Sequence, residues 1–198
     1  AAAAADHASK DVERYHAALE RALLAFHSSR MAVVNAALRE LWQKTYRGGD
    51  VDRIAVRADA DAKSARSHNY RLVMVAGGAE LEMRGRASAG QKVLAAVLVR
   101  LALSEAFAGA ASILTLDEPT TNLDAAHSAA LADALKAVLD ARGGGGGGGG
   151  GLQLVIITHD EAFARALGAR TLTDTMWRVT KDGGQTSTIR RVPVLEDD

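Results

Sequence analysis

The sequence predicts an α/β fold in which helices and antiparallel strands flank a core of parallel strands, preceded by a long helix. Residues 1–46 contain no Gly or Pro, which favours one continuous helix. Residues 51–82 alternate apolar and polar positions, which is typical of antiparallel strands. Two short apolar runs, 112–116 and 152–158, enclose a helical pattern over 126–141. A strand, a helix and a second strand in this order predict a right-handed parallel crossover.

Composition limits the classes of protein to which the chain can belong. At 198 residues it fits one domain, which would bury roughly 70% of its unfolded surface. Basic and acidic residues balance, so net charge gives no argument for nucleic acid. Without cysteine there is no disulfide, Cys-type zinc site or thiol nucleophile. The sequence has no long apolar run and no signal-peptide pattern, so we expect a soluble, intracellular protein with no membrane partner.

The leading helix carries an apolar stripe. Residues spaced by three and four positions form it: Val12, Tyr15, Leu19, Ala22 and Phe26. This heptad spacing breaks at residues 29–30 and resumes near Val34. Two heptads are fewer than a coiled coil usually shows, so the periodicity leaves two interpretations open. The segment is either an amphipathic helix on a domain or the end of a coiled coil.

Glycines mark the turns of the chain. Gly77-Gly78 lies between two alternating segments and predicts a hairpin turn, whereas residues 58–69 are predicted to form a polar loop. The nine consecutive glycines at 143–151 cannot build packed structure, and we interpret them as a flexible insertion. Residues 171–181 and 185–192 flank an Asp-Gly-Gly turn and predict a closing antiparallel hairpin.

A predicted helix over 89–107 begins with Ser88-Ala89-Gly90-Gln91. Ser-x-x-Gln is a capping box, in which the Ser hydroxyl and the Gln side chain satisfy exposed amides of the first turn. A helix N-terminus also offers free amides and a positive dipole end to anions. Gly90 would let a phosphate come close to the backbone. The capping and phosphate-binding interpretations are compatible.

Two carboxylates follow the first apolar strand. Asp117 and Glu118 lie at its carboxyl end, where open α/β sheets bind ligands. Adjacent strand residues point to opposite sides, which suits one carboxylate to hold magnesium and the other to orient an attacking water. A bare Asp-Glu pair is more often a solvated turn. The apolar strand before this pair and the Pro-Thr-Thr-Asn-Leu-Asp of 119–124 after it favour the functional interpretation.

Two further residues lie at the ends of this strand–helix–strand unit. Asp124 precedes the central helix and is predicted to be its N-cap. If the two parallel strands are neighbours, His159 emerges on the same rim as Glu118, where it is a candidate contact for a γ-phosphate. A lone His there is more often a capping or core residue. The sequence contains no Gly-x-x-x-x-Gly-Lys-Ser/Thr, so no loop of this chain can wrap phosphates in the P-loop manner.

Four motifs occur in a fixed order: Ser88–Gln91, an apolar strand ending in Asp117-Glu118, Asn122-Leu123-Asp124, and Thr158-His159-Asp160. Together they resemble the C-terminal half of an ABC-type P-loop ATPase head. The flanking segments narrow the resemblance: residues 15–19, 40–52, 70–74 and 83–86. These are similar to the eukaryotic Rad-fifty ATPase family of double-strand-break repair, whose bacterial relative is SbcC. The resemblance covers nearly the whole chain.

The resemblance implies a role for each residue of the signature motif. Ser88, Ala89, Gly90 and Gln91 match the signature that contacts the γ-phosphate of an ATP molecule held by the opposing subunit. Ala87 stands where animal relatives are expected to have a cysteine. We expect this departure to matter little, because the neighbouring residues make the contact.

The resemblance also assigns the carboxylates and the residues around them. Asp117 matches the aspartate that holds Mg²⁺, and Glu118 matches the glutamate that activates water. Asn122 and Asp124, with the leucine between them, match the D-loop that crosses the dimer interface. His159 matches the switch histidine. ATP and Mg²⁺ are therefore the expected ligands, and zinc is expected only in the hook region of the full-length family.

Such heads close around two ATP molecules, and closure repositions coiled coils, DNA and a nuclease. The implied domains are a coiled-coil arm end, 1–46, and a C-terminal ATPase lobe, 47–198. The implied partners are the chain's own N-terminal ATPase lobe, a second copy of the head, a nuclease of the Mre-eleven/SbcD type and double-stranded DNA, in the nucleus. Since the Walker A motif, Q-loop and hook are absent, we expect a fragment that hydrolyses ATP only when the missing lobe complements it.

Three alternatives remain open at this point. A chromosome-organising SMC-type ATPase would share the fold, although Pro119-Thr120-Thr121-Asn122 differs from the usual segment of that class. A transporter ATPase would need a Walker A motif upstream and no long leading helix. The chain could also be a non-catalytic interaction lobe whose helix docks a partner. The basic residues near the signature serve either DNA or an interface: Arg84, Arg86, Lys92 and Arg100.

Overall fold

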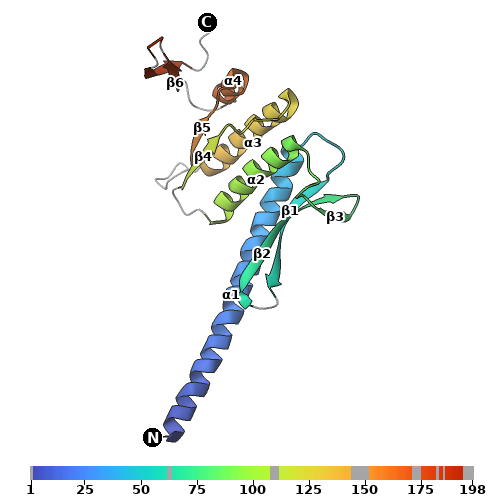
Figure 1. The fold of residues 1–198 in the computed structure, drawn as a ribbon, viewed down its shortest axis with the longest axis vertical. Helices are drawn as coiled ribbons and strands as arrows, with labels where there is room; N and C mark the ends of the chain where they lie inside the picture. Colours follow the sequence, from blue (N-terminus) through green and yellow to red (C-terminus); the bar gives the residue numbers. More distant parts are fainter. Residues whose placement is uncertain are drawn as a thin grey trace.

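The computed structural model describes residues 2–61, 64–107, 112–143, 152–170, 175–181, 183–184 and 186–193 (Figure 1). The helices are α1 (Ala2–Thr45), α2 (Ala89–Phe107), α3 (Ala125–Gly143) and α4 (Glu161–Arg170). The strands are β1 (Arg53–Asp61), β2 (Ser64–Ala76), β3 (Ala79–Glu82), β4 (Ser112–Asp117), β5 (Leu152–Ile157), β6 (Thr175–Lys181) and β7 (Ser187–Pro193). The α/β class predicted from the sequence is confirmed.

Helix α1 has two parts with different surroundings. Its N-terminal part projects away from the other elements (Figure 1), and the predicted apolar stripe there is exposed, with Tyr15 73% accessible. One face of its C-terminal part is buried from Val34 to Thr45 and includes Trp42, whose indole N–H donates to the Val51 carbonyl at 3.1 Å. The helix is therefore held by its last turns.

Strands β1, β2 and β3 form an antiparallel sheet beside α1. Gly77 and Gly78 both have positive φ (55° and 83°) and form the predicted hairpin turn. The predicted polar loop over 58–69 is wrong, because β1 and β2 continue to Asp61 and from Ser64 with Ala58 paired to Tyr70. Cross-strand hydrogen bonding keeps this polar stretch extended, and polar residues are no obstacle on a solvated sheet face.

One side chain of α1 locks this sheet to the helix. The Asn35 amide donates to the Val56 carbonyl at 3.0 Å, and Asn35 Oδ1 accepts from the Val56 N–H at 2.7 Å. The N–H and carbonyl of Val56 face α1 rather than another strand, and the Asn35 amide satisfies both of them. The sheet therefore has one fixed position along α1.

Strands β4 and β5 form the predicted parallel pair, in register from Ser112–Leu152 to Asp117–Ile157. The sequence predicts that both strands are buried, and this is wrong for one face of the pair. Side chains of Ile113, Val155 and Ile157 are 71%, 39% and 54% exposed. Leu116, on the other face, is buried. The described strands thus present an uncovered apolar face, which their sequence could not reveal.

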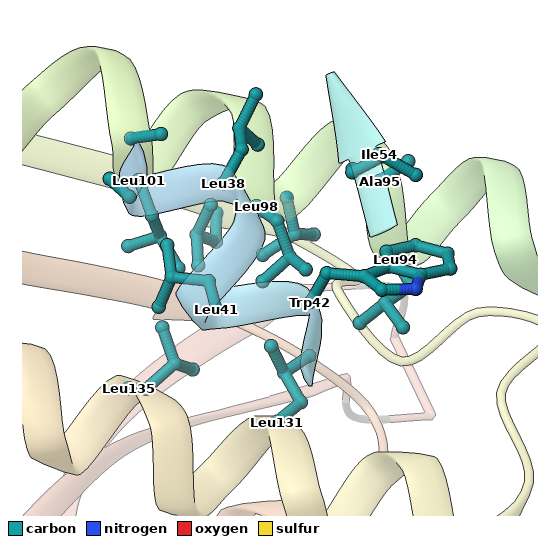
Figure 2. Packing of buried hydrophobic residues seen from close by; sticks show 14 of the residues in the cluster. Leu38, Leu41, Trp42, Ile54, Leu94, Ala95, Leu98, Leu101, Leu131 and Leu135 are labelled. Atoms are coloured by element: carbon teal, nitrogen blue, oxygen red, sulfur yellow. The ribbon is translucent and has the colours of Figure 1, made fainter. Parts of the chain in front are cut away.

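The core lies where α1, α2 and α3 meet (Figure 2). Helix α2 is apolar on most sides, and its buried residues are Leu94, Ala95, Val97, Leu98, Leu101, Ala102 and Ala106. Leu38 and Trp42 of α1 and Leu131 and Leu135 of α3 belong to the same cluster. Burial of each Leu side chain stabilises the fold by about 1.5–3 kcal/mol. These contacts place the two helix starts that carry polar motifs, at Ala89 and Ala125.

Strands β6 and β7 pair antiparallel from Thr175–Pro193 to Lys181–Ser187, as predicted for the closing hairpin. Most of the glycine tract, residues 144–151, lies outside the described residues. Within the described part of the chain, none of the helices has the length and hydropathy needed to cross a membrane.

Candidate functional site

The first turn of α2 is closed by a reciprocal capping box, as the sequence predicts. The Ser88 N–H donates to Gln91 Oε1 at 2.9 Å, and the Gln91 N–H donates to Ser88 Oγ at 3.2 Å. Because Ser88 Oγ acts here as an acceptor, its own O–H is left to donate. The amides of Ala89 and Gly90 belong to the first turn and have no carbonyl of the helix to bond. The helix start can therefore donate several hydrogen bonds to an anion.

The Gln91 side chain bonds to residues that follow the end of α1. Its Nε2 donates to the Tyr46 hydroxyl at 2.7 Å and to Asp50 Oδ2 at 2.9 Å. Both N–H groups of the amide are thus engaged inside the protein. Gln91 therefore holds the first turn of α2 in place, and the donors that remain for an anion would be those of Ser88, Ala89 and Gly90.

Gly90 lies against the backbone of the Asn122-Leu123-Asp124 turn. A Cβ atom at Gly90 would lie 2.8 Å from the Asn122 carbonyl oxygen, closer than real side chains approach. Asn122 itself has a φ of 62°, a left-handed conformation that Asn adopts more easily than most residues. The absence of a side chain at position 90 therefore lets the signature motif and this turn touch directly.

Asp124 is the N-cap of α3, as predicted. Its Oδ1 accepts from the backbone N–H of His127 at 2.8 Å and lies 2.8 Å from Nδ1 of the His127 ring. These hydrogen bonds, the backbone one first, hold the pKa of the Asp124 carboxyl below its usual value. The carboxylate at the end of the turn is therefore ionised and fixed.

His127 connects this carboxylate to the segment just after α1. Its Nε2 accepts from the Arg47 backbone N–H at 3.2 Å, so this bonding pattern assigns the ring proton to Nδ1, facing Asp124. The His127 ring also contacts the Tyr46 ring, with centroids 5.4 Å apart, and Tyr46 stacks on Trp42 at 4.5 Å. Three aromatic rings thus join α1 to the start of α3.

Tyr46 and Asp50 form the polar end of this contact. The Tyr46 hydroxyl donates to Asp50 Oδ1. Burial, followed by this hydrogen bond, raises the pKa of Tyr46. The same hydrogen bond lowers the pKa of Asp50. At neutral pH the pair is therefore a neutral phenol bonded to a carboxylate.

Glu118 occupies a strained position at the end of β4. Its N–H donates to the Ile157 carbonyl at 2.9 Å, which extends the ladder with β5. Its φ is 45°, which is uncommon for a residue with a long side chain. The Thr121 hydroxyl donates to the Glu118 carbonyl at 3.0 Å and holds the turn. Strain held in place by neighbouring bonds is typical of functional sites.

The Glu118 carboxylate and His159 share one rim, as predicted. The His159 N–H donates to Glu118 Oε1 at 3.0 Å, and Nδ1 of the ring lies 2.8 Å from Oε2. This ring contact is an ion pair when His159 is protonated, and the buried Oε2 has no hydrogen-bond partner besides it among the described residues. Glu118 raises the pKa of His159, first because its carboxylate hydrogen-bonds to the protonated ring and then because of its charge.

Asp117 ends β4, paired with Ile157, and its side chain is exposed at the same edge of the sheet. Among the described residues, no group of three or more His, Asp or Glu side chains could hold a metal by itself. Magnesium bound to a nucleotide needs only one or two carboxylates, because phosphates and water supply the other ligands. Asp117 alone fits that requirement.

The structure gathers the predicted residues into two groups. The signature motif contacts the turn through Gly90 and Asn122, and Glu118 contacts His159. No hydrogen bond joins the two groups among the described residues. Sequence reasoning missed Tyr46, Asp50 and His127, which contact the first group. Of these, only His127 had a local signal, because it lies three residues after an N-cap aspartate.

Replacing Gly90 with Ala should destabilise the protein. In an open helix the change would stabilise by up to about 1 kcal/mol, but the new Cβ would meet the Asn122 carbonyl oxygen at 2.8 Å. Overpacking of this kind costs about 1–3 kcal/mol. Urea unfolding should show a lower midpoint at unchanged slope. Gly49→Ala, where nothing lies within 4 Å of the new Cβ, is the control, and equal midpoints for both variants would contradict the close contact.

Substituting Glu118→Gln should lower the pKa of His159 toward its ordinary value of about 6.5, because the neighbouring carboxylate raises it. NMR titration of the ring in both proteins measures this. The folded state favours the protonated ring, so its stabilisation is present below about pH 6.5 and disappears as the pH rises through the raised pKa. The ring is 87% exposed, so solvent keeps the contribution small.

Glu161→Gln is the matched control for this titration, because Glu161 is an exposed acid two residues from His159. It should leave the His159 titration in place. A ring that titrates identically in the wild-type protein and in Glu118→Gln would show that the rim contact does not form in solution.

The chain is similar in sequence to known DNA repair proteins. No family model matches the chain. It is 47% identical over 189 residues to DNA repair protein RAD50 of Arabidopsis thaliana, and 42% and 41% identical to those of Dictyostelium discoideum and Saccharomyces cerevisiae. The matches cover 96%, 94% and 93% of this chain. The chain spans 14% of the length of each of these relatives.

Solved structures show the same fold at lower sequence identity. An SMC ATPase from work on ATP-driven dimerization superposes with a TM-score of 0.57 at 16% identity, covering 86% of this chain and 89% of that one. The Smc head of Pyrococcus furiosus, bound to a domain of ScpA, gives 0.54 at 18% identity, covering 82% and 35%. The likeness to SMC proteins is thus one of fold, whereas sequence identity decides the family: the chain belongs to the eukaryotic type of the Rad50 DNA repair proteins and corresponds to their C-terminal portion.

Proposed function

We propose that this chain is the signature-bearing half of an ATP-hydrolysing head that acts in repair of DNA double-strand breaks. The observation that carries the proposal is the Glu118 carboxylate, held at a strand end by the His159 N–H at 3.0 Å, with its second oxygen 2.8 Å from the exposed His159 ring. Such a carboxylate suits a general base, because movement of the ring, whose side chain is 87% exposed, would open Oε2 to a water molecule. Membership of the Rad50 family supports the same role.

The residues present fit ATP and Mg²⁺. Asp117 would hold the metal ion, which neutralises phosphate charge and orients the phosphoryl group when bound. Ser88 Oγ and the amides of Ala89 and Gly90 would donate to a phosphate, assisted by the positive end of the α2 dipole. The carboxylates at the end of β4 accept hydrogen bonds or bind a cation, whereas the start of α2 donates hydrogen bonds. The two sites lie on different elements.

The chain's own groups then have separate tasks. Glu118 would accept a proton from the attacking water through Oε2, while the His159 N–H keeps Oε1 in place. The exposed His159 ring, whose pKa is raised by Glu118, would donate a hydrogen bond to a phosphate oxygen when it is protonated. The Ser88 O–H would donate a hydrogen bond to the phosphate, while Oγ still accepts from the Gln91 N–H in the capping box.

The first partner that we propose is the missing N-terminal lobe of the same head. The described β4–β5 pair leaves the apolar side chains of Ile113, Val155 and Ile157 exposed, and strands of parallel sheets are normally covered on both faces. This chain also lacks the motif that cradles phosphates. A lobe that continued the sheet and supplied that motif would cover the face and complete the site. In this proposal 47–198 is one lobe of a two-lobe head.

The second partner is another helix along the arm. Exposed apolar side chains lie on the projecting part of α1: Val12, Tyr15, Leu19, Leu23 and Phe26. Their heptad spacing suits packing against one more helix. We therefore propose that residues 1–46 end a coiled-coil arm. A non-catalytic lobe that only docked a partner through this helix would not need the contact between Glu118 and His159.

The remaining partners follow from the family. We propose that a second copy of the head faces the signature motif and the Asn122–Asp124 turn, which lie together at the start of α2 and α3. Arg84 and Arg86 are exposed beside the signature and would serve double-stranded DNA or this interface. A nuclease of the Mre-eleven/SbcD type and a nuclear location complete the proposal.

Glu118→Gln should abolish turnover while preserving ATP binding. The experiment uses the two-lobe head, defined here as this chain combined with a separately expressed lobe that carries a Walker A motif. The amide keeps an oxygen for the His159 N–H but cannot accept a proton, so we expect a fall in turnover of about 10²–10⁴-fold. Equilibrium nucleotide binding and phosphate release are the measurements.

Glu161→Gln is again the matched control, because it removes an exposed carboxylate close to the rim without touching Glu118. It should retain turnover. Undiminished phosphate release by the Glu118→Gln head would remove Glu118 from the mechanism. Loss of ATP binding in that variant would instead assign it a binding role.

A further inference from the structure

Tyr46 and Asp50 form a hydrogen-bonded unit just beyond the end of α1, and the proposed mechanism does not use it. The Tyr46 hydroxyl donates to Asp50 Oδ1 and accepts from Gln91 Nε2 at 2.7 Å. Gln91 Nε2 also donates to Asp50 Oδ2 at 2.9 Å. Residues 41 to 45 positions apart in the sequence are thus joined by side chains alone. The last turn of the arm helix therefore has a direct polar link to the signature motif.

This link fixes which way the Gln91 amide faces. Its NH₂ group points to a hydroxyl and a carboxylate, while its oxygen accepts from the Ser88 N–H at 2.9 Å. Turning the amide over would set its oxygen against the Asp50 carboxylate and its NH₂ against the Ser88 N–H. Both contacts would be repulsive. The orientation of Gln91, and with it the position of Ser88, thus depends on Tyr46 and Asp50.

The backbone near Tyr46 is built to keep its ring in place. A Cβ atom at Gly48 would lie 2.3 Å from the Tyr46 hydroxyl oxygen, so the ring occupies the space that any side chain at position 48 would fill. The Trp42 ring stacks on the Tyr46 ring, with the two centroids 4.5 Å apart. The ring has little room to move away from Gln91.

The same ring reaches the second surface motif. Tyr46 contacts the His127 ring, His127 Nε2 accepts from the Arg47 N–H at 3.2 Å, and His127 Nδ1 lies 2.8 Å from Asp124 Oδ1. One end of the arm helix is therefore bonded to Ser88 through Gln91 and to Asp124 through His127. These are the two motifs that the proposed function sets against a second head.

We propose that Tyr46, together with Asp50, is a positioning residue that sets Ser88 through Gln91, so that the end of the arm helix and the signature motif move as one unit. This inference rests on the proposed function for the role of Ser88. Displacement of the end of α1 would carry Tyr46, Gln91 and Ser88 with it and so change the fit of Ser88 to a phosphate held by the other head. The arm would in this way control closure of the heads.

The test is Tyr46→Phe in the two-lobe head, which removes the hydroxyl and keeps the stacked ring. Closure around a non-hydrolysable ATP analogue, measured by light scattering, should weaken about threefold to tenfold, the effect of one lost hydrogen bond. ATP binding to a single head should not change. Tyr70→Phe, which also removes a hydroxyl, in this case one hydrogen-bonded to His27 of α1 at 2.8 Å, should change neither quantity.

A double-mutant cycle separates positioning from a general loss of stability. If Tyr46 acts through Ser88, Tyr46→Phe should have no further effect on closure in a Ser88→Ala head. Additive losses would overturn the proposal, as would unchanged closure in Tyr46→Phe alone. A second readout needs no nucleotide: hydrogen exchange of the Ser88 amide should become faster in Tyr46→Phe, because its acceptor, Gln91 Oε1, loses its fixed orientation.

The two readouts distinguish failure of this inference from failure of the proposed function. A wild-type two-lobe head that neither closes nor hydrolyses ATP would refute the function, and the exchange of the Ser88 amide would still decide the positioning role. A head that closes normally, in which Tyr46→Phe alters neither closure nor Ser88 exchange, would refute the inference and leave the function intact.

Discussion

Burial of the last turns of α1 between α2, α3 and the β1–β2 sheet is the interaction on which the rest of this structure depends. Leu38 and Trp42 are almost fully inaccessible, and they belong to one buried cluster with leucines of both α2 and α3 (Figure 2). Because α2 begins with the signature motif and α3 begins at the Asp124 cap, their positions follow from this packing. The positions of these two polar motifs thus depend on the apolar packing beneath them.

The same packing keeps two unusual backbone conformations in place. Among the described residues other than glycine, Glu118 and Asn122 are the two with positive φ, and both lie in the turn between β4 and α3. Such conformations cost about 1–3 kcal/mol each and persist when their surroundings determine them. Here the β4–β5 ladder holds one end of the turn, and the Asp124 cap holds the other. The strain aims the Glu118 carboxylate at His159.

Local chemistry explains how much of this could be predicted from sequence. The capping box at Ser88, the N-cap at Asp124 and the parallel strand pair depend on residues within a few positions or on simple periodicity, and each was predicted correctly. The meeting of Glu118 and His159 followed from the strand order. The strand-end carboxylates and the helix start indicated magnesium and a phosphate by themselves, whereas an ATP molecule held by an opposing subunit was implied only by the family resemblance.

Other features depend on contacts that a single sequence does not display. The stretch 58–69 is polar enough to suggest a loop, yet cross-strand hydrogen bonds hold its described residues as strand. The apolar run containing Ile157 cannot reveal that one of its faces lacks a cover among the described elements. Tyr46 and Gln91 are far apart in the chain, and their bond exists only because α1 and α2 pack together.

The central claim is that this chain is one lobe of an ATPase head and is inactive until a second lobe completes it. The most direct measurement mixes it with a separately expressed lobe carrying a Walker A motif and follows complex formation and magnesium-dependent ATP hydrolysis, against each lobe alone. The account predicts a one-to-one complex and turnover only in the mixture. A mixture that forms no complex, or a stable complex without turnover, would contradict it.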